Sequence, residues 1–189
     1  MEAQENIVGF RQSLLVSPET AADIPARDAL LDRAMGPRWR KKSSEKLRKG
    51  RIPSEGLALI ARDASGSVIG TVRLWDVAAG ADRRRALLLG PLAVEPTLKS
   101  AGIGSELMRE AVAEAARLGH TAIILVGDAP YYGRFGFSAE KTGMLAMPGP
   151  YEKHRLLALE LVPGALDEAH GVIRPTGRKI KRARIAHAV

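Results

Sequence analysis

Two apolar runs flank one amphipathic segment near the middle of the chain, and this arrangement constrains the fold most. The first run, "ALLLGPLAV" (86–94), is apolar throughout, as expected for a strand that is covered on both faces. From Ile103 to Leu118 the apolar residues recur at helical spacing, and Gly119 ends the pattern. The second run, "HTAIILVG" (120–127), follows at once. This order predicts a right-handed strand–helix–strand crossover with parallel strands.

Gly90 and Pro91 interrupt the first apolar run. Proline has no N–H to donate to a strand ladder, so a central strand that carries one is expected to bulge there. Such a bulge would splay the strand from one neighbour and open a slot in the sheet.

The rest of the chain completes a mixed α/β pattern. Before the crossover we expect strands at 11–17, 57–62 and 68–75, helices at 24–35 and 41–50, and a polar loop at 76–85. Ser43 or Ser44 is the expected N-cap of the second helix, and Gly66 the turn residue between the last two strands. After the crossover we expect a short helix or turn at 129–137 and a closing hairpin from strands 143–147 and 154–162.

The composition limits the chemistry. The chain has no cysteine, which excludes disulfides, a thiolate nucleophile and cysteine-based metal sites. Its four histidines show no i, i+4 pair, so we expect no metal. The first residues lack a signal-peptide pattern and no apolar run is long enough for a membrane helix, so we expect a cytoplasmic protein without a membrane partner.

The net charge of +8 comes from two short segments, 38–51 and 174–184. The remainder of the chain is acidic on balance, so we interpret the two segments as solvated faces or loose chain, and we do not expect nucleic acid as a partner. The predicted organisation is one domain over residues 1–165 and a mobile basic extension over 166–189.

The segment "KSAGIGSELM" (99–108) places two glycines at the start of the predicted helix. A helix N-terminus offers unpaired N–H groups and a partial positive charge, and bare glycines let a phosphate approach them. Tight helix–strand packing is the alternative reason for Gly102 and Gly104. Neither the P-loop pattern nor the dinucleotide pattern G-x-G-x-x-G is present, since Leu107 stands at the third glycine position.

The same segment resembles the central motif of the GNAT superfamily of acyl-CoA-dependent N-acyltransferases, [R/Q]-x-x-G-x-[G/A]. A later family motif, a tyrosine followed by three residues and Gly-Phe, corresponds to Tyr132, Gly136 and Phe137. The stretch from "LLLGPLAVEP" to "LVGDAPYYGRFGF" (87–137) looks most like the YhbS-like branch of predicted acetyltransferases, and the resemblance covers about residues 52–162. The resemblance implies the GNAT fold: a mostly antiparallel central sheet with one parallel, splayed strand pair and flanking helices.

The resemblance also implies acetyl-CoA as cosubstrate, with its pyrophosphate on the glycine turn and its pantetheine arm along the splayed strand. Lysine replaces the motif's usual arginine or glutamine, so Lys99 meets a phosphate as a point charge without the bidentate fork. The residues that the resemblance assigns to coenzyme binding are Leu92, Ala93, Val94, Lys99, Ser100, Ala101, Gly102, Ile103, Gly104 and Ser105.

Acetyl transfer needs an oxyanion donor and an acid for the leaving thiolate. A backbone N–H near Val94 is the expected donor and, from its motif position, Tyr132 the catalytic acid; Tyr131 is expected to pack the core. With no cysteine in the chain, we expect direct transfer in a ternary complex. The general base stays open between a water chain and one of three carboxylates, those of Asp76, Glu95 and Asp128.

The sequence thus predicts an acetyltransferase that moves an acetyl group from acetyl-CoA to a primary amine of an unidentified acceptor. The alternative is a coenzyme-binding regulatory or nucleic-acid-associated module with little catalysis. Arg73 and Trp75 face either the acceptor pocket or the solvent side of a half-exposed strand, and Arg134 is expected to be structural. The oligomeric state stays open, with the family's homodimer through its closing strands as one option.

Overall fold

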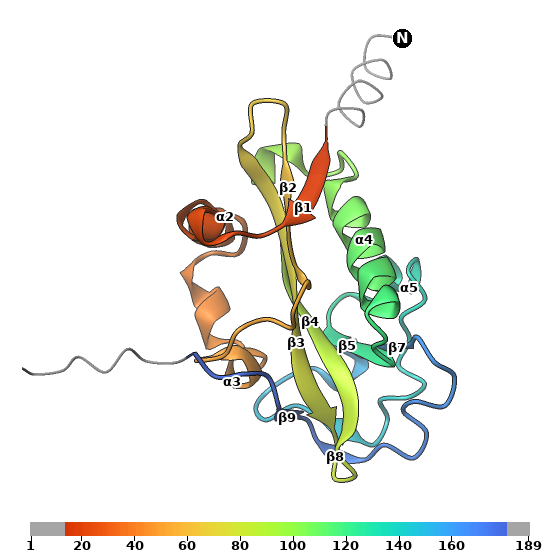
Figure 1. The fold of residues 1–189 in the computed structure, drawn as a ribbon. Coiled ribbons are helices and arrows are strands. Elements are labelled where there is room, and N and C mark those ends of the chain that lie inside the picture. The colour runs from red at the N-terminus through yellow and green to blue at the C-terminus, as the bar shows by residue number, and fades with distance from the viewer. Residues whose placement is uncertain (1–13, 181–189) are drawn as a thin grey trace, which may run out of the picture.

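The computed structural model describes residues 14–180, apart from the side chains of residues 37 and 38. Within this part a seven-stranded sheet is flanked on one face by helices α4 and α5 and on the other by α2 and α3 (Figure 1). None of these helices is long and apolar enough to cross a membrane. In the order of the sheet the strands are β1 (Leu15–Pro18), β2 (Ala58–Arg62), β3 (Val68–Ala79), β4 (Arg84–Val94), β5 (Ala122–Val126) and β7 (Leu156–Glu160), with β9 (Arg174–Pro175) paired to β3.

The remaining elements lie outside this sheet. The α-helices are α2 (Ile24–Met35), α3 (Glu45–Arg48), α4 (Ile103–Arg117) and α5 (Ala129–Gly133). The 3-10 turns are η1 (Ala21–Asp23), η2 (Pro37–Lys41), η3 (Pro96–Leu98) and η4 (Lys153–Arg155). A second, two-stranded sheet pairs β6 (Leu145–Ala146) with β8 (Gly171–Val172).

The predicted crossover is confirmed: β4 and β5 are parallel and α4 connects them. Helix α4 buries the apolar stripe that the sequence shows, from Ile103 to Ala115, in the larger of two hydrophobic cores. The expectation fails only at Leu118, which is 40% exposed. The helix ends at Arg117, so Leu118 lies at the C-cap, beyond the turn that faces the sheet.

The polar loop predicted at 76–85 is wrong. Strand β3 continues to Ala79 and β4 starts at Arg84, leaving a tight turn in which Gly80 and Arg83 both have positive φ. The extension forms because Val77 and Ala79 are buried in the second hydrophobic core, which outweighs the polar composition of the segment.

Two details of the short α3 region were partly predicted. Gly50 follows the helix with a φ of 72°, as expected for a helix stop. A serine side-chain cap is absent, however, among the described contacts of α3. Ser43 donates instead to the Pro150 carbonyl, and the Ser44 hydroxyl accepts a hydrogen bond from Arg48 at 2.9 Å.

The predicted closing hairpin is wrong as well. Strand β7 pairs antiparallel with β5, whereas β6 pairs in parallel with β8, a strand that the sequence analysis did not identify. The first three residues of β7 are fully buried beside β5, so its apolar run belongs in the main sheet. The two-residue β6 contributes Leu145 to the second core beneath it.

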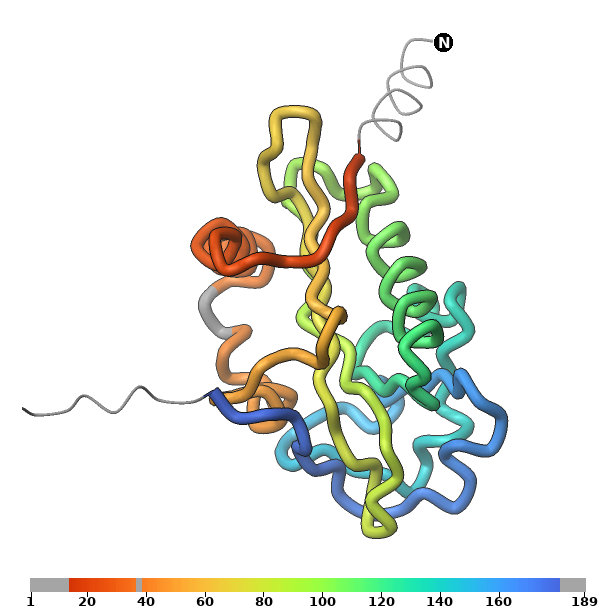
Figure 2. Tube along the Cα trace, viewed as in Figure 1, coloured from red at the N-terminus to blue at the C-terminus, as the bar shows by residue number. Residues whose placement is uncertain are grey.

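The C-terminal segment 166–180 packs on the body of the fold, against the expectation of a mobile extension from residue 166. Its apolar residues Leu166, Ala169 and Ile173 are buried in the second core. Strand β9 pairs with β3, and the Ile52 N–H donates to the Arg178 carbonyl at 3.0 Å. Figure 2 shows this blue segment running beside α3. Residues 181–189 of the predicted extension lie outside the described part.

Candidate functional site

The predicted splay of β4 is confirmed. Within the described residues, β4 pairs with β5 only at Leu87 and Leu88 and then separates from it. On its other edge β4 stays paired with β3, and the register shifts across Gly90 and Pro91. Backbone groups of residues 89–94 that point away from β3 are therefore left facing an opening, and this is the slot that the glycine–proline interruption predicts.

Trp75 and Arg73 do not line this opening. The Trp75 indole N–H donates to the Gly90 carbonyl at 2.6 Å, so this buried tryptophan holds the bulge in place. Arg73 is buried beside the Glu19 carboxylate at 3.3 Å, and burial lowers the pKa of its guanidinium to about 10. Both residues therefore belong to the support of the site rather than to its surface.

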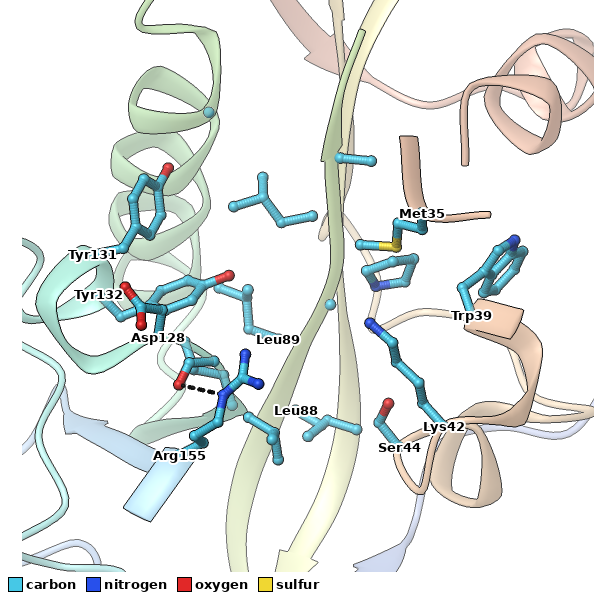
Figure 3. Close-up of a pocket in the computed structure, with 18 of the residues that line it drawn as sticks. Met35, Trp39, Lys42, Ser44, Leu88, Leu89, Asp128, Tyr131, Tyr132 and Arg155 are labelled. Atoms are coloured by element: carbon cyan, nitrogen blue, oxygen red, sulfur yellow. Dashed lines mark hydrogen bonds between the residues drawn. The ribbon is translucent and has the colours of Figure 1, made fainter. Parts of the chain in front are cut away.

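A cavity of about 420 Å³ surrounds the bulge, and β4 runs through its middle (Figure 3). Side chains of two groups line it on opposite sides of the strand. The α5 side consists of Asp128, Tyr131, Tyr132 and Arg155. The α2–α3 side consists of Met35, Trp39, Lys42, Ser44 and Arg48.

Tyr132 lies on the α5 side with its ring against the end of β5. A Cβ added to Gly127 would stand 2.6 Å from Tyr132 Cδ2 and closer still to Cε2, so only glycine leaves room for this ring. Tyr131 and Phe137 pack on it edge-on. Burial raises the pKa of the Tyr132 phenol to about 12, so this phenol holds its proton more strongly than an ordinary tyrosine. The sequence analysis missed Gly127, although a glycine directly after a buried strand was a usable signal.

The glycine turn forms the second part of the site. Gly102 is the N-cap of α4 with a φ of 87°, and Ser100 also has a positive φ. The first N–H groups of the helix therefore point out of the turn without a partner inside the helix. A hollow of about 580 Å³ lies over them and is edged by Lys99, Arg109 and Arg134. This geometry suits an anion.

The hollow over the turn and the cavity around β4 adjoin, because Val94, Gly104 and Tyr131 line both. At the junction a Cβ on Gly104 would stand 2.9 Å from the Tyr131 hydroxyl, so a larger residue would displace that ring. Of the ten predicted binding residues, only Ala101 lines neither space; it packs against the larger core. The predicted residues that line one space or both are Leu92, Ala93, Val94, Lys99, Ser100, Gly102, Ile103, Gly104 and Ser105.

The structure separates the three candidate carboxylates. Glu95 forms an ion pair with Arg33 at 2.8 Å, and Asp76 accepts a hydrogen bond from Ser54 and lines a different hollow. Asp128 alone of the three lines the cavity. It stands at the N-terminus of α5, and its main-chain carbonyl accepts the N–H groups of both tyrosines.

Arg134 supports the site from outside, as expected. Its Nε donates to the Tyr131 carbonyl at 3.2 Å, and its guanidinium lies 4.6 Å from the Tyr131 ring centroid. It also edges the hollow over the glycine turn, together with Arg109. The sequence analysis did not identify either cation as a candidate for anion binding.

The whole α2–α3 side was missed. Its residues come from the basic segment 38–51 and the end of α2, which the charge pattern presented as solvated surface. Lys42 is exposed, whereas the Arg48 side chain is only 6% exposed, so the two cations of this segment that line the cavity differ in burial. Nothing in a run of lysines and arginines distinguishes these two roles.

The model of the acetyltransferase (GNAT) domain matches residues 54–139, which contain the splayed strand, the glycine turn and Tyr132. A curated relative, the uncharacterized N-acetyltransferase YhbS of Escherichia coli K12, is 28% identical over 160 residues, or 85% of this chain and 95% of that one. Residues 54–139 thus match the GNAT acetyltransferase domain, and most of the chain is similar to an N-acetyltransferase of that family.

Solved structures of this family share the fold. The crystal structure of YhbS from Escherichia coli in complex with CoA matches with a TM-score of 0.74 and 27% identity, covering 87% of this chain and 90% of that one. A GNAT-family acetyltransferase from Brucella melitensis in complex with acetyl-CoA matches with a TM-score of 0.58 and 25% identity, covering 82% and 98%. The predicted fold class is confirmed.

Proposed function

We propose that this GNAT-family enzyme transfers the acetyl group of acetyl-CoA to a primary amine by direct attack in a ternary complex. The observation that carries the proposal is the pair of adjoining spaces that runs from the glycine turn, past the open edge of β4, to Tyr132. It places an anion site at one end and a protonated phenol at the other. A phosphorylated thioester needs the first for its phosphates and the second for its leaving sulfur. Relatives of the chain were solved with CoA and with acetyl-CoA.

The two spaces fit the two ends of the proposed cosubstrate. The first-turn N–H groups of α4 would hold the pyrophosphate, with Lys99, Arg109 and Arg134 at its edge. The free backbone groups of residues 92–94 would pair with the amides of the pantetheine arm, as a neighbouring strand would. This assignment uses nine of the ten residues that the family resemblance implies and leaves Ala101 in a packing role.

The chemistry then needs two groups of this chain beside the thioester. A backbone N–H of β4 near Val94 would donate to the carbonyl oxygen as it gains negative charge. Tyr132, which keeps its proton, would give it to the sulfur as the C–S bond breaks. The proton that the amine loses would leave through water or Asp128, the carboxylate of the α5 side. The chain has no cysteine to form an acyl-enzyme, which favours direct transfer.

The direct test measures thiol release from acetyl-CoA across a panel of amines, with mass spectrometry of the products. We expect release to depend on the amine and to yield an N-acetyl product. Salt-sensitive binding of RNA or DNA without any thiol release would instead support the coenzyme-binding or nucleic-acid-associated module.

A further inference from the structure

Arg48 is a buried cation that the proposed acetyl transfer leaves unused. Its side chain is 6% exposed, and Nη2 contacts Glu45 at 2.7 Å and the Ser44 hydroxyl at 2.9 Å. No acceptor among the described residues reaches its buried Nε. A buried, charged donor without an acceptor is costly, so such a group calls for a specific reason.

The guanidinium of Arg48 lies beside the bulge of β4. A Cβ added to Gly90 would stand 3.5 Å from Arg48 Nη1, so the bare glycine leaves open space between the strand and this nitrogen. The Gly90 carbonyl is held by the Trp75 indole. Arg48 therefore lines the cavity from α3, on the face of the sheet opposite α5 (Figure 1).

The charge on the α2–α3 side is one-sided. Among the described residues that line it, Lys42 and Arg48 are cationic and no carboxylate is present. In Figure 3 the Lys42 side chain extends towards β4. The nearby carboxylate of Asp32 is taken up by Trp39 and Arg40, and Glu45 is held by Arg48 itself. An acceptor with a second positive charge would be repelled here.

We propose that the acceptor is a small amine that also carries an oxyanion, a carboxylate or a phosphonate-type group, and that Arg48 is the residue that selects it. The proposal rests on the acetyltransferase function above. Arg48 and Lys42 hold the oxyanion on the α2–α3 side, and the amine of the same molecule reaches past Gly90 to the splay.

The transfer balances with the groups already named. The amine lone pair forms the N–C bond to the acetyl carbon, and the C–S bond breaks with its electron pair on sulfur. Tyr132 protonates the sulfur, and the proton that the nitrogen loses passes through water or Asp128 and so restores the phenol. The products are an N-acetylated acid and free CoA, and the oxyanion of the acceptor takes no part in bond changes.

The test compares acceptors that differ only in the oxyanion. Common α-amino acids are paired with their amides, and β-alanine and 2-aminoethylphosphonate are each paired with propylamine. For the intact protein we expect kcat/KM to be about tenfold or more higher for the anionic member of at least one pair, the scale of a charge-assisted hydrogen bond. The β-alanine and phosphonate arms identify which oxyanion the site prefers.

Variants then tie the preference to Arg48. Arg48→Gln is expected to remove it, lowering kcat/KM for the anionic acceptor about tenfold or more while the uncharged partner changes little. The acetyl-CoA-induced rise in Tm should persist. Arg117→Gln, at an exposed arginine of α4, is the matched control and should retain the preference. Lys42→Gln, at an exposed position, tests the same charge if Arg48→Gln does not fold.

Each adverse result has a distinct meaning. Turnover that favours the uncharged or cationic amines overturns the assignment of the acceptor and leaves acetyl transfer standing. If thiol release is too slow to compare, the Tm of the CoA-saturated protein is measured with each member of the same pairs. An equal Tm within every pair also overturns the assignment of the acceptor. Failure of both thiol release and acetyl-CoA stabilisation refutes the proposed function itself.

Discussion

On the α5 side of β4 the site depends on main chain and glycine, whereas on the α2–α3 side it depends on charged and aromatic side chains. The α5 side uses a splayed strand edge, the first turn of α4, and Gly104 and Gly127 as spaces for two tyrosine rings. The α2–α3 side uses a long lysine, a buried arginine and a tryptophan on short helical segments. The first construction fits a constant molecule such as a coenzyme, and the second can change with the acceptor.

The largest expected effect comes from the proton donor of the α5 side. Tyr132→Phe removes only the hydroxyl and should lower kcat by about 10²- to 10³-fold, with little change in acetyl-CoA affinity. Steady-state kinetics and a thermal shift with acetyl-CoA measure the two quantities. Tyr131→Phe is the comparison, and equal turnover of both variants with the unsubstituted enzyme would mean that the sulfur takes its proton from elsewhere.

A titration checks that the buried phenol is Tyr132. Its pKa is raised from 10.0 to about 12, so the folded state favours the protonated form. The contribution of this pKa shift to the free energy of unfolding is present in full below pH 10 and is lost as the pH rises towards 12. The difference in tyrosinate absorbance between the unsubstituted protein and Tyr132→Phe should rise near pH 12 and not near pH 10.

Gly127→Ala should act on the same ring by displacement. The new methyl group would overlap the Tyr132 ring, and a shift of this size in a catalytic group costs about 10²-fold in rate. We expect kcat to fall while the acetyl-CoA thermal shift remains. Gly143→Ala is the matched control, because nothing lies within 4 Å of a Cβ at Gly143. Unchanged kcat in Gly127→Ala would show that the ring position is unimportant.

Gly104→Val tests the anion end of the α5 side. Ligand at about 100 times its Kd stabilises a protein by about 2.7 kcal/mol, so near-saturating acetyl-CoA should raise Tm measurably. Valine should abolish this rise and leave the free protein folded, because the nearest obstacle is the hydroxyl end of the Tyr131 side chain and not backbone. The measurement is the Tm of the variant with and without acetyl-CoA. A rise in Tm equal to that of the unsubstituted protein would mean that the anion binds elsewhere.

Truncation addresses the α2–α3 side and has the smallest expected effect. Deleting residues 174–189 removes β9 and the backbone contacts with Ile52 and Gly50, so we expect a loss of about 1–2 kcal/mol, or roughly 2–8 °C in Tm. Acetyl-CoA should still stabilise the shortened protein. A chain that lacks only residues 181–189 is the control. The charge pattern alone predicts an unchanged Tm for both truncated chains. That result would restore the interpretation of residues 174–184 as loose chain.

The same comparison explains what the sequence could reveal. Glycines, a proline inside an apolar run and one amphipathic helix report backbone requirements, and backbone requirements leave marks in a local pattern. The splay and the glycine turn were therefore predictable, and Tyr132 followed from a motif. Arg48 was not, because its burial depends on Gly90 and on packing of α3 against β9, elements far apart in the sequence.

The failed predictions have the same cause. Val77 and Ala79 continue β3 because a core formed partly by Leu166 and Ile173 covers them, and the local sequence is polar. Strand β7 joins β5, not β6, because its buried residues fill the sheet edge beside the crossover. Each of these two errors concerns an element whose packing partner lies far from it in the sequence.

The contact between α3 and the C-terminal segment also sets an order of assembly during translation. Arg51, just beyond α3, donates to the Gly177 carbonyl across 126 positions of sequence. At a synthesis rate of about 5–20 residues per second, that interval lasts roughly 6–25 s, during which β4, the glycine turn and Tyr132 all emerge from the ribosome. The nascent chain therefore acquires the parts for holding a coenzyme before the wall that faces the acceptor is fastened. A chain interrupted after Tyr132 but before Gly177 therefore contains β4 and the glycine turn, yet lacks the carbonyl that fastens the end of α3.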